Sequence, residues 1–147
     1  MRLALVVAVM VALTGCRGFL TPSRTFDTVL EEPAAFDPLP LRVADETGMV
    51  RDVIAEVGIV RGPFDGRGAL SNPPGQPNRL IVQWVGGACD ERTELSVAHG
   101  AEGRLHLVLD TVVREQVCND IGIFRAVSLT LAVPVEASEA NLDFARK

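Results

Sequence analysis

Side chains that could act as nucleophiles or general bases are few in this 147-residue chain, and none has a known catalytic spacing. No serine stands in GxSxG or SxxK, the patterns that expose and activate a serine hydroxyl. The two histidines, His99 and His106, fall in a predicted turn and on the outward face of a predicted strand. We therefore predict surface histidines, no catalytic residue and no enzymatic activity, with an enzyme whose site is assembled only by folding as an alternative.

Carboxylates are more numerous, and three pairs lie near predicted strand ends: Asp45-Glu46, Asp90-Glu91 and Asn119-Asp120. Loops that converge at one end of a sandwich could offer the six to eight oxygens that Ca²⁺ requires. The chain has no EF-hand spacing, and an acidic protein carries carboxylates in its loops in any case. Solvated loops are the favoured interpretation, and we predict no metal and no cofactor.

Gly86 and Gly87 do not form a phosphate cradle, because no helix and no GK[ST] sequence follow them. A bulge or a close approach to the neighbouring cysteine is the expected reason for two glycines. Arg125 lies close in sequence to Asp120, and the fold could bring it close to Asp90. We predict a salt bridge from Arg125 that organises this loop.

The N-terminus carries an export signal. Arg2 precedes an unbroken apolar run over residues 3–13. A helix of that length spans only about 16 Å, roughly half of a ~30 Å hydrocarbon core, so a transmembrane helix is not expected. A charge followed by a short apolar run is typical of a secretory signal.

The run ends in Leu13, Thr14, Gly15 and Cys16, which resembles the lipobox of bacterial lipoproteins. The resemblance implies cleavage between Gly15 and Cys16 and a lipid anchor, diacylglyceryl and palmitate, on the Cys16 thiol. It places the protein in the cell envelope, anchored to a bacterial membrane with its domain outside the cytoplasm.

The chain has two further cysteines, Cys89 and Cys118. Export places them in a compartment where disulfides persist, and we predict that they pair. Zinc is the alternative, but there is no CxxC sequence and no nearby histidine pair.

The composition is 48% hydrophobic and 22% charged, with a net charge of -5. These values exclude a disordered chain and a general nucleic-acid binder, which needs a basic surface. Loss of Arg2 with the signal makes the mature chain more acidic still. An acidic domain is repelled by anionic lipids, so the lipid on Cys16 must provide the membrane attachment.

Short alternating runs predict an all-β domain. Trp84 is expected to pack in its core, on a central strand with apolar residues on both faces, and Ser128 is expected at a solvated outward position. Seven strands are expected over residues 41–45, 49–57, 79–85, 93–98, 104–112, 126–133 and 140–144, the first two forming a hairpin. This pattern favours an immunoglobulin-like antiparallel β-sandwich, with a small β-barrel as the alternative. Because the chain has no tyrosine, it lacks the tyrosine corner of true immunoglobulin domains.

Three segments are expected: a signal peptide over residues 1–15, a lipidated N-terminus and proline-interrupted flexible linker over 16–40, and the sandwich over 41–147. Within the sandwich, Trp84, residues 86–90, Cys118, residues 121–123, Arg125 and residues 134–137 resemble small bacterial lipoproteins of unassigned function. That resemblance implies a disulfide-tied extracytoplasmic domain and no particular activity.

These features predict a membrane-anchored, non-catalytic binding or envelope-accessory module with a possible protein partner in the envelope. An inhibitor of extracytoplasmic proteases is the alternative within this class, with the Pro/Gly-rich residues 62–77 as the presented segment.

Overall fold

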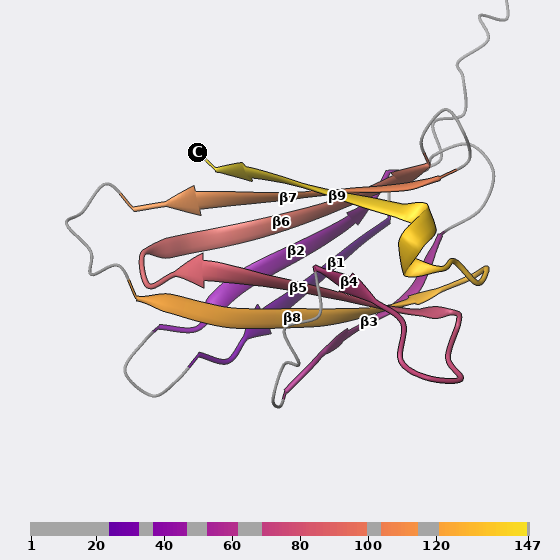
Figure 1. Ribbon diagram of the computed structural model, residues 1–147. Coiled ribbons are helices and arrows are strands. Elements are labelled where there is room, and N and C mark those ends of the chain that lie inside the picture. The colour runs from indigo at the N-terminus through magenta and orange to yellow at the C-terminus, as the bar shows by residue number, and fades with distance from the viewer. Residues whose placement is uncertain are drawn as a thin grey trace, which may run out of the picture.

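Two β-sheets pack face to face in the computed structural model, with the hydrophobic core between them (Figure 1). The structure describes residues 24–32, 37–46, 53–61, 69–99, 104–114 and 121–146. The sheets remain separate and do not close into a barrel. The predicted all-β sandwich is confirmed, and the alternative of a small barrel is wrong.

The five-stranded sheet has the order β1-β2-β6-β7-β9. Its strands are β1 (Arg24–Leu30), β2 (Leu39–Asp45), β6 (Asp90–His99), β7 (Leu105–Val113) and β9 (Ala140–Arg146). The four-stranded sheet has the order β3-β8-β5-β4. Its strands are β3 (Ile54–Ile59), β8 (Gly122–Leu131), β5 (Arg79–Gly87) and β4 (Leu70–Ser71). One short 3-10 turn, η1 (Ala137–Glu139), precedes β9.

The pairing of the strands differs from the expectation of seven antiparallel strands. Nine strands are present in the described residues, and two of the pairings, β2 with β6 and β7 with β9, are parallel. In both cases the chain passes through the other sheet before it returns beside its earlier strand. Alternation of apolar residues has the same period in parallel and antiparallel strands, so the sequence pattern does not distinguish them.

The segment predicted as a linker, residues 16–40, contains a strand of the sandwich. β1 lies within it and pairs antiparallel with β2 along its whole length, from Arg24 opposite Asp45 to Leu30 opposite Leu39. Phe26 and Leu30 pack on the core. The described part of the sandwich therefore begins at Arg24, eight positions after Cys16.

The hairpin predicted for the first two strands is also wrong, because β2 and β3 belong to different sheets. Asp45, at the end of β2, explains the crossing. Its Oδ2 accepts hydrogen bonds from the backbone N–H groups of Val53 and Ile54, at 2.6 and 2.9 Å, and the residue is 3% exposed. A buried carboxylate thus joins the two sheets where the chain passes from one to the other.

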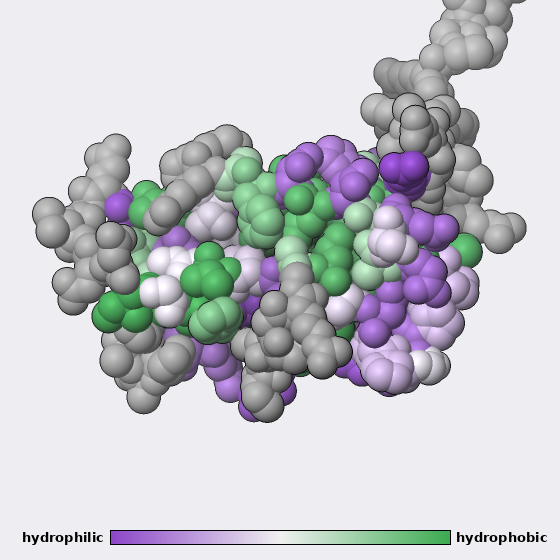
Figure 2. All heavy atoms as spheres, in the orientation of Figure 1, coloured by the Kyte–Doolittle hydropathy of each residue, from purple (hydrophilic) through white to green (hydrophobic). Residues whose placement is uncertain are grey.

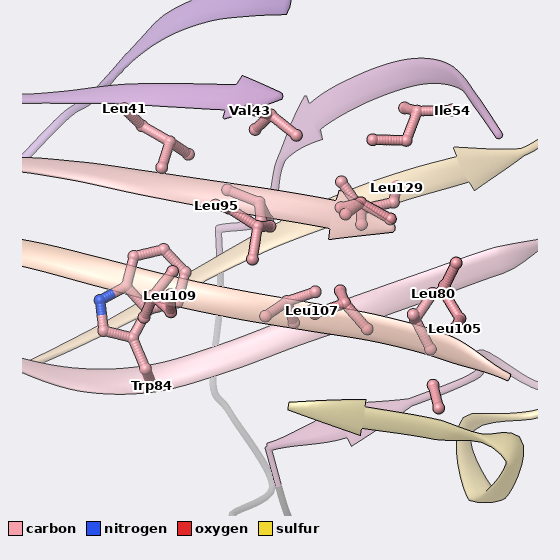
Figure 3. Packing of buried hydrophobic residues seen from close by; sticks show 14 of the residues in the cluster. Leu41, Val43, Ile54, Leu80, Trp84, Leu95, Leu105, Leu107, Leu109 and Leu129 are labelled. Atoms are coloured by element: carbon pink, nitrogen blue, oxygen red, sulfur yellow. The ribbon is translucent and has the colours of Figure 1, made fainter. Parts of the chain in front are cut away.

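The core consists of the inward positions of both sheets, seen from close by in Figure 3. Leu80, Val82 and Trp84 of β5 are buried, as their alternation predicts. Leu95 and Leu109 from the five-stranded sheet belong to the same core cluster (Figure 3). Apolar residues on both faces correctly predicted that β5 lies inside its sheet.

Candidate functional site

The sandwich has two ends with different chemistry. β1 and β3 begin at the Arg24 end, where Arg24 lies opposite Asp45. The other end, called the Arg125 end, contains the end of β1, the turn between β5 and β6, and the start of β8. In Figure 1 the Arg24 end is on the right and the Arg125 end on the left.

A buried charge cluster occupies the Arg125 end. The Arg125 Nε donates to Glu32 Oε1 at 2.7 Å, its Nη1 donates to Asp90 Oδ2, and its Nη2 donates to the Gly87 carbonyl at 3.2 Å. The side chains of Arg125, Glu32 and Asp90 are 4%, 3% and 2% exposed. One arginine therefore joins three separate segments: the residues after β1, the start of β6, and β8.

The glycines of the turn make room for this cluster. A Cβ on Gly86 would lie 1.8 Å from Arg125 Nη1 and 2.3 Å from Asp90 Oδ2, so no other residue fits without displacing the ion pair. The Gly87 N–H donates to Asp90 Oδ2 at 2.8 Å. The close approach that the glycine pair predicts is to the guanidinium of Arg125.

The predicted salt bridge between Arg125 and Asp90 is confirmed. Glu32 was not predicted, because it falls in the segment interpreted as a linker. The packing of Phe26 and Leu30 on the core, which makes the preceding residues a strand, was the missing information. Asp120, the other expected partner, lies outside the described residues. Because each of the two carboxylates already binds the guanidinium, the cluster is suited to holding segments together.

Trp84 adds an unusual feature beside the cluster. It lies opposite Arg125 in the pairing of β5 with β8, so both side chains are on the inner face. The ring is 6% exposed, and its Nε1 is buried without a hydrogen-bond partner in the described part of the protein. The prediction that Trp84 packs in the core is confirmed.

Two of the three acidic pairs lie in the described residues, and these two do not converge. Asp45 lies at the Arg24 end and Asp90 at the Arg125 end, because β2 and β6 run parallel with Asp45 opposite Val97. Asp45 binds backbone amides, and Glu46 accepts a hydrogen bond from the Ser96 hydroxyl at 3.3 Å. Among the described residues, no three His, Cys, Asp or Glu side chains are grouped to hold a metal ion.

The structure confirms one prediction for a single polar residue and contradicts two others. His106 is on the surface as predicted, with its side chain 43% exposed and its Nε2 2.8 Å from Asp143 Oδ2. His99 ends β6 rather than lying in a turn. Ser128, predicted to be solvated, is instead 4% exposed and donates to the Gly58 carbonyl at 3.4 Å.

Of the predicted site residues, Cys16 and Cys118 lie outside the described residues. Cys89 lies in the β5–β6 turn, 6% exposed, next to the charge cluster. Its carbonyl accepts a hydrogen bond from the Arg114 N–H at 3.0 Å. The disulfide with Cys118 and the lipid on Cys16 remain predictions.

The segment predicted for protease inhibition, residues 62–77, is described from residue 69 onward. This part includes β4 and is held at Asn72. The Asn72 amide donates to the carbonyls of Arg79 and Val135, both at 3.0 Å, and accepts from the Ala137 N–H at 2.6 Å. Inhibition of proteases stays a prediction.

Comparison with known proteins returns no relative: no protein-family model, curated protein or solved structure matches this chain. Within the ranges that the structure describes, no helix is long and apolar enough to cross a membrane.

Proposed function

We propose that this protein is a lipid-anchored binding module of the bacterial cell envelope, attached through Cys16, with its sandwich outside the cytoplasm and without catalytic activity of its own. The observation that carries the proposal is in the sequence: Arg2, the apolar run and the residues Leu13 to Cys16 occur in the order that a lipoprotein signal requires.

The fold supports this proposal by shortening the tether. Eight residues lead from Cys16 to Arg24, where β1 begins. Even fully extended, they reach only about 28 Å. An anchor on Cys16 therefore keeps the Arg24 end near the bilayer, while the Arg125 end is directed away from it when the sandwich stands upright.

A disulfide between Cys89 and Cys118 belongs to the same proposal. The Cys89 carbonyl binds the N–H of Arg114, which is only four residues before Cys118 in the sequence. Four residues span up to about 14 Å, so Cys118 is within reach of Cys89. An oxidising compartment outside the cytoplasm would allow the bond to form and persist.

A protein partner is favoured by apolar side chains on the outer face of the four-stranded sheet at the Arg125 end. Val85 and Phe124 lie directly opposite each other on β5 and β8 and are 59% and 65% exposed. Exposed apolar patches of this kind are typical of binding surfaces.

The anchor is tested with Cys16→Ser expressed in a bacterial host. We expect the wild-type protein to partition into the detergent phase of a phase-separating detergent, and the variant to remain in the aqueous phase or as uncleaved precursor. Unchanged processing and partition of the variant would refute lipidation.

The partner is tested with a photo-crosslinking residue at position 124 and, as a control, at the exposed Arg42 on the outer face of the other sheet. We expect a discrete crosslinked protein on intact cells from position 124 only. Equal crosslinking from both positions would contradict a partner at Val85 and Phe124.

A further inference from the structure

A polar hollow of about 340 Å³ lies on the outer face of the four-stranded sheet, toward the Arg24 end. Glu56 of β3 and Arg79 of β5 both lie opposite Thr130 of β8, one on each side of it. Three neighbouring strands therefore contribute a carboxylate, a hydroxyl and a guanidinium, side by side, to the hollow.

Gly58 of β3 lines the hollow. It lies opposite Ser128, and a Cβ in its place would be 2.8 Å from the Ser128 hydroxyl oxygen. The absence of a side chain on Gly58 makes room for the Ser128 hydroxyl, and both residues line the hollow beside Glu56 and Arg79.

The two charges at the walls are not paired with each other. No ion pair joins Glu56 and Arg79 in the described part of the chain, and Arg79 donates instead to the Gln76 side chain at 3.3 Å. Two strand spacings separate their backbones, about 10 Å. A simple anion bound at Arg79 would be repelled by Glu56, and a simple cation bound at Glu56 would be repelled by Arg79. A ligand that carries both a positive and a negative charge can pair with Glu56 and with Arg79 at once.

The hollow lies beside the place where the chain enters the sandwich. The Arg24 guanidinium donates to the carbonyl of Ile54 at 3.4 Å, two residues before Glu56 on the same strand. Hydrophilic residues also gather at this end, on the right in Figure 2. If Cys16 carries the lipid, the hollow is within reach of the membrane surface.

We propose that this hollow binds a zwitterion made of a phosphate and an ammonium group, with the phosphate at Arg79 and the ammonium at Glu56. The headgroup of a zwitterionic phospholipid has this chemistry, and so does free phosphoethanolamine. The lipid as its source rests on the proposed anchor, whereas the chemistry of the site does not. A neutral headgroup also avoids the repulsion that an acidic domain meets at anionic lipids.

The experiment uses the mature chain from residue 16 with Cys16→Ser, so that no lipid of its own contributes. Phosphoethanolamine is titrated while backbone amide signals are followed by NMR, with inorganic phosphate and ethanolamine as separate probes. Flotation with phosphatidylethanolamine vesicles and with phosphatidylglycerol vesicles then tests the lipid source. Glu56→Gln and Arg79→Gln are the site variants. Glu94→Gln and Arg42→Gln are the matched controls, because this pair lies opposite each other on the outer face of the five-stranded sheet.

We expect phosphoethanolamine to shift the amide signals of Gly58 and Thr130 and to bind at least tenfold tighter than either separate probe. We expect each site variant to weaken this binding tenfold or more, and neither control to weaken it. Flotation with phosphatidylethanolamine alone identifies the lipid as the source; binding of the free zwitterion without flotation identifies a soluble ligand of the same chemistry. No shift at Gly58 and Thr130, or equal losses in the controls, would overturn the site. Because the anchor is removed here, these results are independent of the test of lipidation.

Discussion

Arg125 binds two buried carboxylates and one carbonyl through a single guanidinium. Replacing it with alanine leaves Glu32 and Asp90 buried without their cation. Removal of one partner from a buried ion pair typically costs about 3–5 kcal/mol. We expect Arg125→Ala to lower the free energy of unfolding by that amount in urea denaturation.

The control for this variant is Arg42→Ala, which removes an exposed arginine from the opposite sheet. Its effect should stay within about 0.5 kcal/mol. Equal midpoints for the two variants would show that the cluster does not stabilise the fold.

Gly86 gives a second prediction at the residue scale. Alanine at this position places a methyl group in contact with Arg125 and Asp90, and we expect a loss of about 2 kcal/mol from overpacking. Gly75 has a φ of 72° and open space around it, so Gly75→Ala should cost only about 1 kcal/mol through backbone strain. Thermal unfolding followed by circular dichroism compares the two, and a larger loss at Gly75 would contradict the close packing at Gly86.

The positions of residues that depend on local sequence could be predicted better than contacts between residues far apart in the chain. The sequence placed Trp84 in the core and joined Arg125 to Asp90, because both follow from strand alternation and from proximity to one turn. Glu32 and the burial of Ser128 could not be predicted, since each depends on a contact more than 60 residues away in the chain.

β1 is the element whose role was underestimated. Prolines flank it and its apolar residues, Phe26, Val29 and Leu30, do not alternate regularly, so its sequence favours a spacer, yet it pairs along seven positions with β2. Edge strands gain their stability from a neighbouring strand, which is a tertiary contact that a local pattern does not contain.

Truncation tests the contribution of β1. A chain that begins at residue 24 keeps β1 and Glu32, and we expect it to unfold at the same temperature as the mature protein. A chain that begins at residue 33 loses the strand and leaves Arg125 with Asp90 as its one described carboxylate, so we expect a melting temperature lower by 10 °C or more, or aggregation. Identical melting of the two chains would restore the interpretation of this segment as a linker.

At the scale of the whole molecule, periodic strands and turn residues predicted a two-sheet sandwich, whereas strand order and the two parallel pairings required the fold itself. The sequence pattern repeats every two residues in any sheet and carries no information on which strands become neighbours. The two ends of the sandwich, one with the charge cluster and one beside the short tether, became distinguishable only with the pairing register.

The proposed disulfide is tested at this scale. Protease digestion of the protein purified from the envelope without reductant should give one peptide pair joined through Cys89 and Cys118, and reduction should separate the pair. Alkylation of both thiols without prior reduction would show that the bond is absent.

The central claim is that Cys16 carries the lipid that holds the sandwich at a bacterial membrane. The most direct measurement is the mass of the N-terminal peptide from protein purified out of the membrane fraction. We predict a peptide that begins at Cys16 and carries diacylglyceryl and acyl groups. A peptide that still contains residues 1–15, or one with an unmodified Cys16, would contradict the account.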